Sequence, residues 1–571
     1  MPRNIHSFTR RQLPLVFAAL AFVGRTSATD LVLPEFPTPP THLEQPDQPP
    51  IRVESWTTSP PAGLTRGLIS LVQVNVDPMG DNVVGDAGNE PSIALDPTHP
   101  LRMAIAWRQF DTVLSNFRQA GYAYSRDGGR TWTFPGVLTP GTFRSDPVLA
   151  SDVTGRFFYN SLRSNFLCDT FISTDGGKTW GSAIPAFGGD KAWIAVDTTG
   201  TEGLGNLYAA WSQNAGCCEG NTFTRSTDHG LTYSTPIEIP ERPLFGTLDV
   251  GPFGELYVAG RLPTSSSQFA VAKSTDAQDP LIPGDQISFT TTQLNLNGTQ
   301  GLGGNSPNPG GLLGQVNVVV DKSTGPTRGH VYVLCSVNPP GDDPMDVVFS
   351  RSTDGGQTWS PPIKVNNSEG AFGNAWQWFG TLSVAPSGRL DAVWNDTRES
   401  GLVNISETRY AFSTNGGQTW SASVALTPAW NSHVGWPNQN KIGDYYHMLS
   451  DNVGADLAMS ATLNGEQDVY YVRIGEHDCN RNSIGDESEL FLGAPDANNN
   501  GIIDTCEQLL GDMNCDGDVD VLDINPFVLA IADPAAYQAA FPSCLLINGD
   551  ADGSGTVNVL DINAFVALLS G

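Results

Sequence analysis

The stretch that decides the fold is SRDGGRTW, which spans Ser125 to Trp132. The same phrase returns along the chain as STDGGKTW from Ser173, STDHGLTY from Ser226, STDGGQTW from Ser352, STNGGQTW from Ser413 and, in a decayed copy, STDAQDP from Ser274. Glycine can adopt the positive φ that a tight turn needs, and Asp and Ser side chains can hydrogen-bond the backbone of the same turn. The phrase therefore predicts a repeated structural turn between two strands rather than a catalytic site.

A second pattern runs in step with the first. Each phrase follows an apolar strand, a turn and another strand, as in SIALDPTHPLRMAIAW (92–107) and TLSVAPSGRLDAVW (381–394). A seventh unit, HMLSDNVGADLAMSATL (447–463), has no phrase and only three apparent strands. Repeats of about 40–50 residues with four strands each are typical of a β-propeller. We predict an all-β propeller over residues 67–474 with seven blades, and six as the alternative. The segment LISLVQVNV (68–76) could supply the missing strand and close the ring.

The phrase resembles the Asp-box, or BNR repeat, of the sialidase superfamily. The pattern Ser-x-Asp-x-Gly-x-Thr-Trp is complete at Ser125, Ser173 and Ser352, whereas Tyr233 replaces Trp and Asn415 replaces Asp in two other copies. The resemblance implies turns on the rim of the propeller, away from the catalytic face. It also implies a candidate activity, the hydrolysis of a terminal sialic acid. Three arginines would then bind the substrate carboxylate, a tyrosine backed by a carboxylate would be the nucleophile, and an aspartate would be the acid/base.

The catalytic motifs of sialidases have no clear counterparts in this sequence, so the catalytic residues stay unassigned. No Arg-Ile-Pro motif opens the propeller; the nearest string, GRLP, contains Arg261 and Pro263 in the wrong blade. Other arginines at strand ends that could converge are Arg108, Arg144, Arg163, Arg398 and Arg409. The string GDYYHM places Asp444 beside Tyr445 and Tyr446, which suits a nucleophile pair but is more typical of blade packing. Two hypotheses remain: a carbohydrate-active enzyme of exo-sialidase-like type, and a non-catalytic propeller that binds glycans or proteins.

The N-terminus and the net charge limit where the protein works and what it binds. Arg3, Arg10 and Arg11 precede the apolar run LPLVFAALAFV, which predicts a signal peptide over residues 1–28 and a secreted or cell-surface protein. We expect no transmembrane anchor, because that run is short and no later segment is apolar enough. Residues 29–66 are rich in proline and predict an extended linker. A net charge of −30 argues against a nucleic-acid partner.

The acidic C-terminus carries two tandem loops that predict calcium binding. DMNCDGDVDVLD (512–523) and DADGSGTVNVLD (550–561) place oxygen-bearing side chains at positions 1, 3, 5, 9 and 12, with a backbone carbonyl at 7. A hard cation such as Ca²⁺ binds six to eight oxygens in such a loop. The predicted ligands are Asp512, Asn514, Asp516, Asp518, Asp520 and Asp523, then Asp550, Asp552, Ser554, Thr556, Asn558 and Asp561.

Each of the two loops runs into a short apolar helix, and residues 510–571 resemble a type I dockerin. The resemblance implies a cohesin-like or cell-surface partner. Dockerins usually carry polar residues at loop positions 10 and 11, however, and here Val521 with Leu522, and Val559 with Leu560, stand there. Calcium binding follows from the loop spacing, whereas a cohesin partner follows only from the resemblance.

Residues 475–509 offer two more loops with the same spacing, which resemble the calcium loops of thrombospondin type 3 repeats. Their predicted ligands are Asp478, Asn480, Asn482, Asp486 and Glu489, then Asp496, Asn498, Asn500, Asp504 and Glu507. A disordered acidic tail is the alternative. Cys479 with Cys506, and Cys515 with Cys544, could each close a small unit in an exported protein, although connectivity cannot be read from the sequence. Together these patterns predict a secreted calcium-binding carbohydrate-active protein.

Overall fold

The computed structural model describes residues 43–50, 57–213, 215–367, 375–496, 498, 500–507 and 509–569. They all belong to the compact unit Thr38–Gly571. The predicted signal peptide lies outside the described residues, as does part of the proline-rich linker. Within the described part of the chain, no helix is both long enough and apolar enough to span a membrane.

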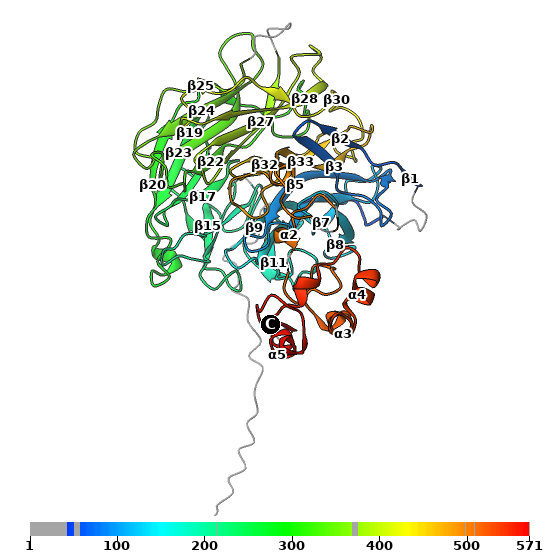
Figure 1. The fold of residues 1–571 in the computed structure, drawn as a ribbon. Helices are drawn as coiled ribbons and strands as arrows, with labels where there is room; N and C mark the ends of the chain where they lie inside the picture. The colour runs from blue at the N-terminus through cyan, green and yellow to red at the C-terminus, as the bar shows by residue number, and fades with distance from the viewer. Residues whose placement is uncertain are drawn as a thin grey trace, which may run out of the picture. The chain divides into compact units, whose positions relative to one another are not determined.

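Seven antiparallel sheets form the blades of a propeller (Figure 1). From the inner to the outer strand, blades one to four are β5(Ala87–Leu95), β6(Met103–Phe110), β7(Gln119–Ser125), β8(Thr133–Val137); β9(Ser145–Ser151), β10(Phe157–Leu162), β11(Cys168–Ser173), β12(Ile184–Pro185); β13(Trp193–Val196), β14(Leu207–Ala210), β15(Asn221–Ser226), β16(Ile237–Glu238); and β17(Leu248–Val250), β18(Leu256–Leu262), β19(Ser265–Ser274), β20(Thr290–Leu294). A short helix, η1(Gly284–Gln286), precedes β20.

Blades five to seven have the same order with additions at their edges. They comprise β22(Asn317–Val320), β23(Val331–Asn338), β24(Asp346–Ser352), β25(Ile363–Lys364), with β21(Thr299–Gln300) also on β23; β26(Gln377–Val384), β27(Leu390–Asp396), β28(Ile405–Ser413), β29(Val424–Ala425), with β30(Trp430–Asn431) also on β28; and β31(His447–Ser450), β32(Gly454–Ala461), β33(Asp468–Gly475), β3(Ile69–Gln73), β2(Gly63–Arg66). Outside the blades, β1(Thr57–Ser59) pairs with β4(Asn82–Val84).

The ring closes through the N-terminal strand, as the sequence predicts. Strand β3 pairs antiparallel with β33, with Ile69 opposite Ile474 and Gln73 opposite Tyr470. The inner strands β5, β9, β13, β17, β22, β26 and β31 contact one another in that order, and β31 contacts β5. Seven blades are therefore confirmed over six. Strand β2 extends the sheet of blade seven into the stretch predicted to be a linker, so the propeller begins at Gly63 rather than at residue 67.

The blades pack through apolar side chains on both faces of their strands. All eight residues of β6 are buried, because neighbouring sheets cover the blade on either side. Between blades one and seven, Trp107 and Ile93 pack with Val469 and Tyr471. The ring of Trp132, from the first box, lies 5.4 Å from that of Tyr471. The aromatic residue that ends the first phrase thus contributes to the contact between blades one and seven.

The repeated phrase forms a self-contained turn. In the first box, Gly129 N donates to Ser125 Oγ at 2.8 Å, and Ser125 Oγ donates to Asp127 Oδ1 at 2.8 Å. Asp127 in turn accepts from the backbone N–H of Thr131 at 2.9 Å and from its hydroxyl at 2.6 Å. The same bonds recur in the boxes that begin at Ser173, Ser226 and Ser352.

Two altered boxes keep the turn with different hydrogen-bonding groups. Asn415 replaces the aspartate of the last box, accepts from Thr419 N at 3.0 Å and donates to the Thr419 hydroxyl at 2.8 Å. In the decayed fourth box, Asp276 instead accepts from the backbone N–H and the hydroxyl of Ser288, twelve residues away. The carboxylate therefore closes a loop even where the phrase is lost, which identifies the box as structural.

The C-terminal segment forms short helices around its own apolar core. Its elements are α1(Asp486–Phe491), α2(Asp504–Glu507), η2(Val521–Asp523), α3(Ile524–Ala532), α4(Pro534–Ala540), η3(Leu546–Gly549), η4(Val559–Asp561) and α5(Ile562–Leu569). Phe527 of α3 and Phe565 of α5 stack with centroids 3.8 Å apart. Met513 and Tyr537 complete the centre of this core. The predicted apolar helices after the tandem loops are therefore present.

Disulfides join both cysteine pairs that the sequence suggested in this segment. Cys479 is bonded to Cys506 and Cys515 to Cys544, with Cα atoms 5.8 and 5.6 Å apart. A third disulfide joins the adjacent Cys217 and Cys218 in blade three. Cys168 and Cys335 are free and buried.

Candidate functional site

The candidate site is a cavity of about 420 Å³ at one end of the central channel, called the funnel site below. Blades one, two, three and seven contribute charged side chains to its wall, and one more comes from the N-terminal segment. The charged lining residues are Glu44, Arg108, Arg118, Asp146, Asp190, Lys191, Lys441 and Asp444. Apolar and glycine residues between Phe245 and Leu312 form the remaining wall.

The Asp-boxes lie at the opposite end of the blades from this cavity. In blade one, Arg108 pairs with Asn89 at the funnel end of β5 and β6, whereas Met103 pairs with Leu95 at the other end. Ser125, which begins the first box, is opposite Met103. The register thus separates the repeated turn from the funnel site by the length of the strands.

An unusual backbone conformation places side chains around the funnel axis. A residue of positive φ lies within four positions of the first residue of every inner strand: Glu90 (53°), Asp146 (46°), Lys191 (57°), Phe245 (55°), Gly314 (139°), Phe379 (60°) and Gly443 (95°). A side chain larger than hydrogen costs about 1 kcal/mol or more in this region of φ. Five of the seven positions nevertheless carry one, and such strain concentrates at functional sites.

Lys191 is the centre of the charge network. Its Nζ lies 2.8 Å from Asp444 Oδ2, 3.0 Å from Asp190 Oδ1 and 3.1 Å from Asp146 Oδ2. The side chain of Lys191 is 7% exposed, and those of Asp146 and Asp444 are 4% exposed. Three blades therefore hold one ammonium among three carboxylates.

A second lysine, Lys441, and the arginine Arg108 connect this centre to Glu90 in blade one. Lys441 Nζ lies 2.6 Å from Asp444 Oδ2 and 3.3 Å from Glu90 Oε1. Arg108 Nη1 lies 3.3 Å from the same Glu90 oxygen. Since Glu90 is fully buried, the network extends below the floor of the cavity.

The network separates the protonation states of its acids. Burial raises the pKa of Asp146, but Lys191 and Arg108 outweigh burial and hold that pKa well below its usual range. Lys191 and Lys441 likewise outweigh burial at Asp444 and lower its pKa. Burial dominates elsewhere: it raises the pKa of Glu90 to about 7 and raises that of Asp190. Ionised and protonated carboxyl groups can thus coexist in one site near neutral pH.

Of the arginines considered from the sequence, Arg108 alone lines the funnel site. Arg144 Nη1 and Arg163 Nη2 both pair with Asp169, at 2.6 and 3.4 Å. Arg398 pairs with Asp396, and Arg409 pairs with Glu399 and Glu407. The guanidinium of Arg261 lies over the ring of Phe245, at 5.1 Å from its centroid. These arginines therefore do not form the three-arginine clamp that the sialidase resemblance implies.

The predicted Asp–Tyr pair is split. Asp444 lines the funnel site, but Tyr445 is buried and its hydroxyl donates to the carbonyl of Pro147 at 2.8 Å. The hydroxyl of Tyr446 donates to the carbonyl of Ser460. Tyr445 also packs edge-on against Trp193, with centroids 5.3 Å apart. Both tyrosines act in packing, as the alternative interpretation of the sequence held.

Both tandem loops are closed by a hydrogen bond to their first predicted ligand. Asp512 Oδ2 accepts from Gly517 N at 3.0 Å, and Asp550 Oδ2 accepts from Gly555 N at 2.7 Å, so position 1 binds the backbone of position 6 in both loops. Oxygens of Asp550, Asp552 and Asp561 lie within 4.8 Å of one another. Positions 1, 3 and 12 of the second loop therefore converge.

The other two loops show the same local design. Asp478 Oδ2 accepts from Ser483 N at 3.0 Å, and Asp496 Oδ2 accepts from Gly501 N at 3.0 Å. Three loop carboxylate oxygens are buried without a hydrogen-bond partner: Asp478 Oδ1, Asp486 Oδ2 and Asp512 Oδ1. Buried oxygens of this kind fit a cation better than an apolar environment, because an unpaired buried carboxylate oxygen is costly.

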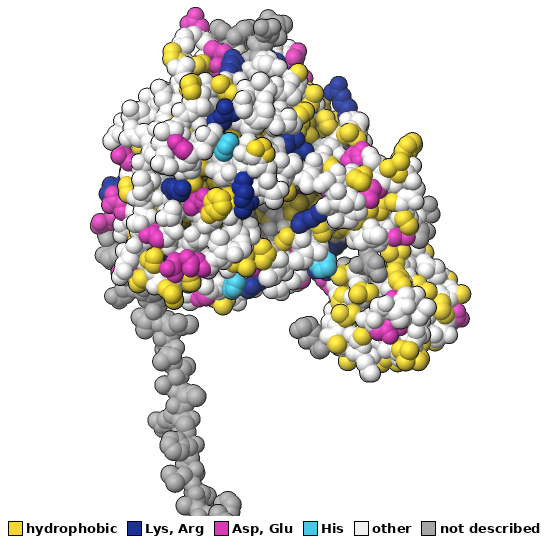
Figure 2. All heavy atoms as spheres, turned by 60° about the vertical axis from the view of Figure 1, so that its left-hand side comes forward, with side chains coloured by type: hydrophobic (Ala, Val, Ile, Leu, Met, Phe, Trp, Pro, Cys, Tyr) yellow, Lys and Arg dark blue, Asp and Glu magenta, His cyan; other side chains and the backbone are white. Residues whose placement is uncertain are grey.

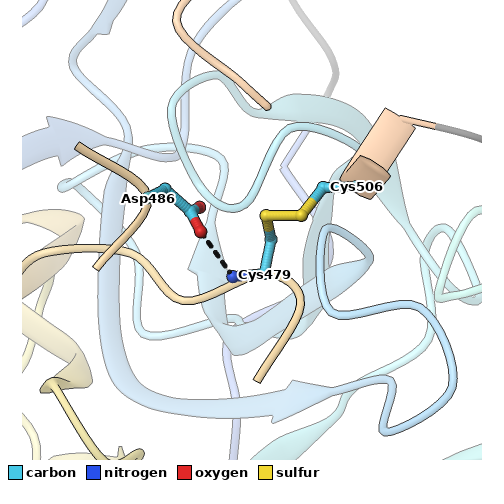
Figure 3. A group of neighbouring side chains, drawn as sticks. All are labelled: Cys479, Asp486 and Cys506. Carbon is cyan, nitrogen blue, oxygen red and sulfur yellow. Dashed lines mark hydrogen bonds between the residues drawn. A yellow bond between two sulfur atoms is a disulfide. The ribbon is translucent and has the colours of Figure 1, made fainter. Parts of the chain in front are cut away.

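Cys479, Asp486 and Cys506 also gather three possible metal ligands (Figure 3). The two sulfurs are joined to each other, and Asp486 Oδ1 accepts from Cys479 N at 3.0 Å. Thiolate coordination is therefore ruled out for the disulfide-bonded state. Asp486 retains its second oxygen for the calcium loop in which the sequence placed it.

The sequence analysis missed Glu44, Glu90, Arg118, Asp146, Asp190, Lys191 and Lys441. A signal was present: a charged residue stands one or two positions before the apolar start of several inner strands, as in NEPSI, SDPVL and GDKAW. Because these residues are far apart in sequence, only the closed ring shows that they face one another.

Comparisons with known proteins give one family model and several similar solved structures. The family model of the BNR/Asp-box repeat matches residues 350–361, the box of blade five. None of the curated proteins matches the chain. Solved structures similar to it include a protein of unknown function from Dyadobacter fermentans (14% identity, 72% of this chain and 100% of the other, TM-score 0.39), a Hadza microbial sialidase (13%, 68% and 66%, 0.37) and the sialidase of Trypanosoma rangeli (13%, 71% and 57%, 0.33).

Proposed function

We propose that this chain is a secreted calcium-binding protein whose propeller binds a glycan at the funnel site. The observation that carries the proposal is the cavity in which four basic and four acidic side chains converge. A sugar offers hydroxyl groups that both donate and accept, so it can use both kinds of charged partner. Bonds to charged groups are the stronger class of hydrogen bond, and the network holds these groups in place before a ligand arrives.

The test compares two buried aspartates of blade two. Asp146→Asn alters the funnel site, whereas Asp169→Asn alters a buried ion pair with Arg144 that does not line the cavity. We expect a glycan array with the full chain in calcium to identify a ligand, and Asp146→Asn to weaken its binding at least tenfold more than Asp169→Asn does. Equal affinities, or no glycan bound by the wild type, would refute this assignment.

Glycoside hydrolysis is a second candidate, favoured by the separation of the carboxyl pKa values. Asp190, with its raised pKa, could donate a proton while Asp146 or Asp444 stays ionised as base or nucleophile. Aryl glycosides, including a sialoside, provide the assay. Asp190→Asn should abolish turnover while leaving ligand affinity within a few-fold, because an amide cannot act as an acid. Absence of turnover on the whole panel would leave a binding propeller.

For the tail, we propose Ca²⁺ in the tandem loops, held by Asp512, Asn514, Asp516, Asp520 and Asp523 and by the matching residues of 550–561. The buried, unpartnered Asp512 Oδ1 and the converging oxygens of the second loop support this assignment. The loops of 475–509 are proposed as further sites on the same grounds. When bound, the cation would neutralise carboxylates that otherwise repel one another.

Calorimetric titration of the full chain with Ca²⁺ tests this proposal. Asp550→Asn with Asp561→Asn should remove one site. Asp533→Asn is the matched control, because Asp533 is in the same module but caps α4 through Ala535 N and Ala536 N. Chelation should also lower the thermal stability of the tail in the wild type. An unchanged stoichiometry in the double variant would contradict the ligand set.

The tail is also proposed as the attachment module. Both tandem repeats expose the same four apolar positions: Val521, Leu522, Ile524 and Val528, then Val559, Leu560, Ile562 and Val566. Over the visible face of the propeller, charged and hydrophobic side chains are dispersed among each other (Figure 2). A panel of cohesins and surface polymers would test the partner. Val521→Asp with Val559→Asp should abolish capture of any true partner, since charged groups at an apolar interface are costly.

A further inference from the structure

The N-terminal segment Leu43–Pro50 is hydrogen-bonded to the funnel end of blades one and two. The backbone N–H of Glu44 donates to the carbonyl of Ser164 at 2.7 Å. Asp47 Oδ2 accepts from the hydroxyl of Ser115 at 3.0 Å and from the backbone N–H of Asn116 at 2.8 Å. The backbone N–H of Asp47 donates in return to Asn116 Oδ1 at 2.7 Å. A short segment that precedes the propeller in sequence is thus held beside its cavity.

This segment places one carboxylate on a funnel arginine. Arg118 Nη2 donates to Glu44 Oε1 at 2.8 Å, and both residues line the cavity. The side chain of Arg118 is 3% exposed, whereas that of Glu44 is 31% exposed. The carboxylate of Glu44 can therefore be displaced by a ligand carboxylate more easily than the buried guanidinium of Arg118 can move.

Arg118 is oriented by the blades rather than by Glu44. Its Nε donates to Ser145 Oγ at 3.0 Å and its Nη1 donates to the carbonyl of Asn116 at 3.3 Å. The guanidinium carbon lies 4.6 Å from the ring centroid of Phe143. Because these contacts fix the plane of the guanidinium, Nη2 would still face the cavity if Glu44 left it.

The charges around Arg118 favour an anion in the place of Glu44. Burial and the nearby Arg108 lower the pKa of Arg118, which shows that its charge is costly there. Arg108 has its own partner, the fully buried Glu90. Removing Glu44 without replacement would leave Arg118 buried without a carboxylate on Nη2, whereas a carboxylate on a ligand would restore the pair.

We propose that Leu43–Pro50 is an internal ligand of the funnel site, and that the external ligand carries a sugar carboxylate which replaces that of Glu44 on Arg118. The inference rests on the proposed glycan binding and adds two statements to it. The glycan is acidic, and its binding requires that Glu44 leave the cavity. Affinity is therefore reduced by the fraction of molecules in which the segment occupies the site.

The test uses the full chain and three probes: an oligoglucuronate, a sialyl-lactose, and lactose as the neutral probe. Glu44→Gln removes the internal carboxylate. Glu238→Gln is the matched control, because it removes an exposed carboxylate from its pair with Arg242 in blade three, outside the cavity. Calorimetry should show that Glu44→Gln binds one of the two acidic probes about tenfold or more tightly than the wild type, with Glu238→Gln unchanged. The acidic probe that responds identifies the source of the carboxylate.

Hydrogen exchange supplies a second readout. Saturating acidic probe should speed exchange in peptides that cover Leu43–Pro50 of the wild type, and Glu44→Gln should speed it without a probe. Equal affinity in wild type and Glu44→Gln, or binding that leaves exchange in the segment unchanged, would overturn the inference while glycan binding itself stands. Binding of neutral glycans alone would likewise overturn the inference and leave the proposed glycan binding intact. Failure of every glycan on the array would instead refute the proposed function.

Discussion

The two ends of the propeller blades are built on opposite principles. At the Asp-box end, one local set of bonds is repeated, and every copy except the decayed fourth one forms these bonds within its own phrase, as Ser352 and Asp354 do with Gly356 and Thr358. At the funnel end, the equivalent positions of the blades carry different side chains, and these satisfy one another across blades, as Lys191 does with Asp444. Repetition therefore maintains the fold, whereas divergence at a repeated position creates the site.

The largest expected effect is at the centre of the funnel network. Lys191→Met leaves the carboxylates of Asp146, Asp190 and Asp444 around a missing ammonium, so we expect a loss of about 3–5 kcal/mol in the free energy of unfolding. Urea denaturation measures this loss. The matched change Lys364→Met affects a pair with Asp346 in which the lysine is 40% exposed, and should cost less than about 1 kcal/mol.

Equal losses of unfolding free energy in the two lysine variants would contradict this prediction, because the funnel network would then be no more cooperative than an exposed ion pair. A double variant that adds Asp146→Asn to Lys191→Met tests the cause of the loss. The double variant should recover part of the loss, since one uncompensated buried charge is then removed.

What the sequence can predict follows the same division. The box turns and the helices after the tandem loops each depend on residues close together in the chain, and both were predicted. The closing strand β3 pairs with the distant β33, but the seventh repeat unit lacked a strand and so indicated it. The funnel site depends on which blades become neighbours. Asp444 was recognised as chemically interesting, but its predicted partner was the adjacent Tyr445. Its true partners include Lys191, which only the closed ring brings to it. The strained positions were hidden for the same reason, because Glu90, Asp146, Lys191 and Phe245 share a backbone conformation but no side-chain chemistry.

A second, intermediate effect depends on pH. Burial raises the pKa of Glu90 from its ordinary 4.5 to about 7, so the folded state holds a proton that the unfolded state releases. The associated stability is fully present below pH 4.5 and is lost as the pH rises through 7. The loss should amount to about 2–3 kcal/mol, and Glu90→Gln should abolish it because glutamine does not ionise.

Urea unfolding of both proteins at pH 4.5, 6 and 8 measures this difference. Glu238→Gln, an exposed glutamate in blade three, is the control and should keep the wild-type profile. If the wild type and Glu90→Gln showed parallel profiles, Glu90 would be ionised throughout, and the funnel network would not couple folding to protonation.

The smallest expected effect is at the box end. Asp354 accepts from the hydroxyl of Thr358 at 2.6 Å and from its backbone N–H at 2.9 Å, and these bonds lower the pKa of Asp354 to about 2. Asp354→Ala removes both acceptors from an exposed turn, so it should cost about 1–2 kcal/mol in urea unfolding. Asp354→Asn should cost less than half of that, because Asn415 already keeps the same turn in blade six through its amide. The loss in Asp354→Ala should also be additive with an alanine change at the aspartate of another box, since the carboxylate of Asp354 accepts hydrogen bonds from residues of its own box. Strong coupling between two boxes would show that the repeated turns stabilise one another. Both ends of the blades would then depend on long-range interactions, and they would differ only in the chemistry of their side chains.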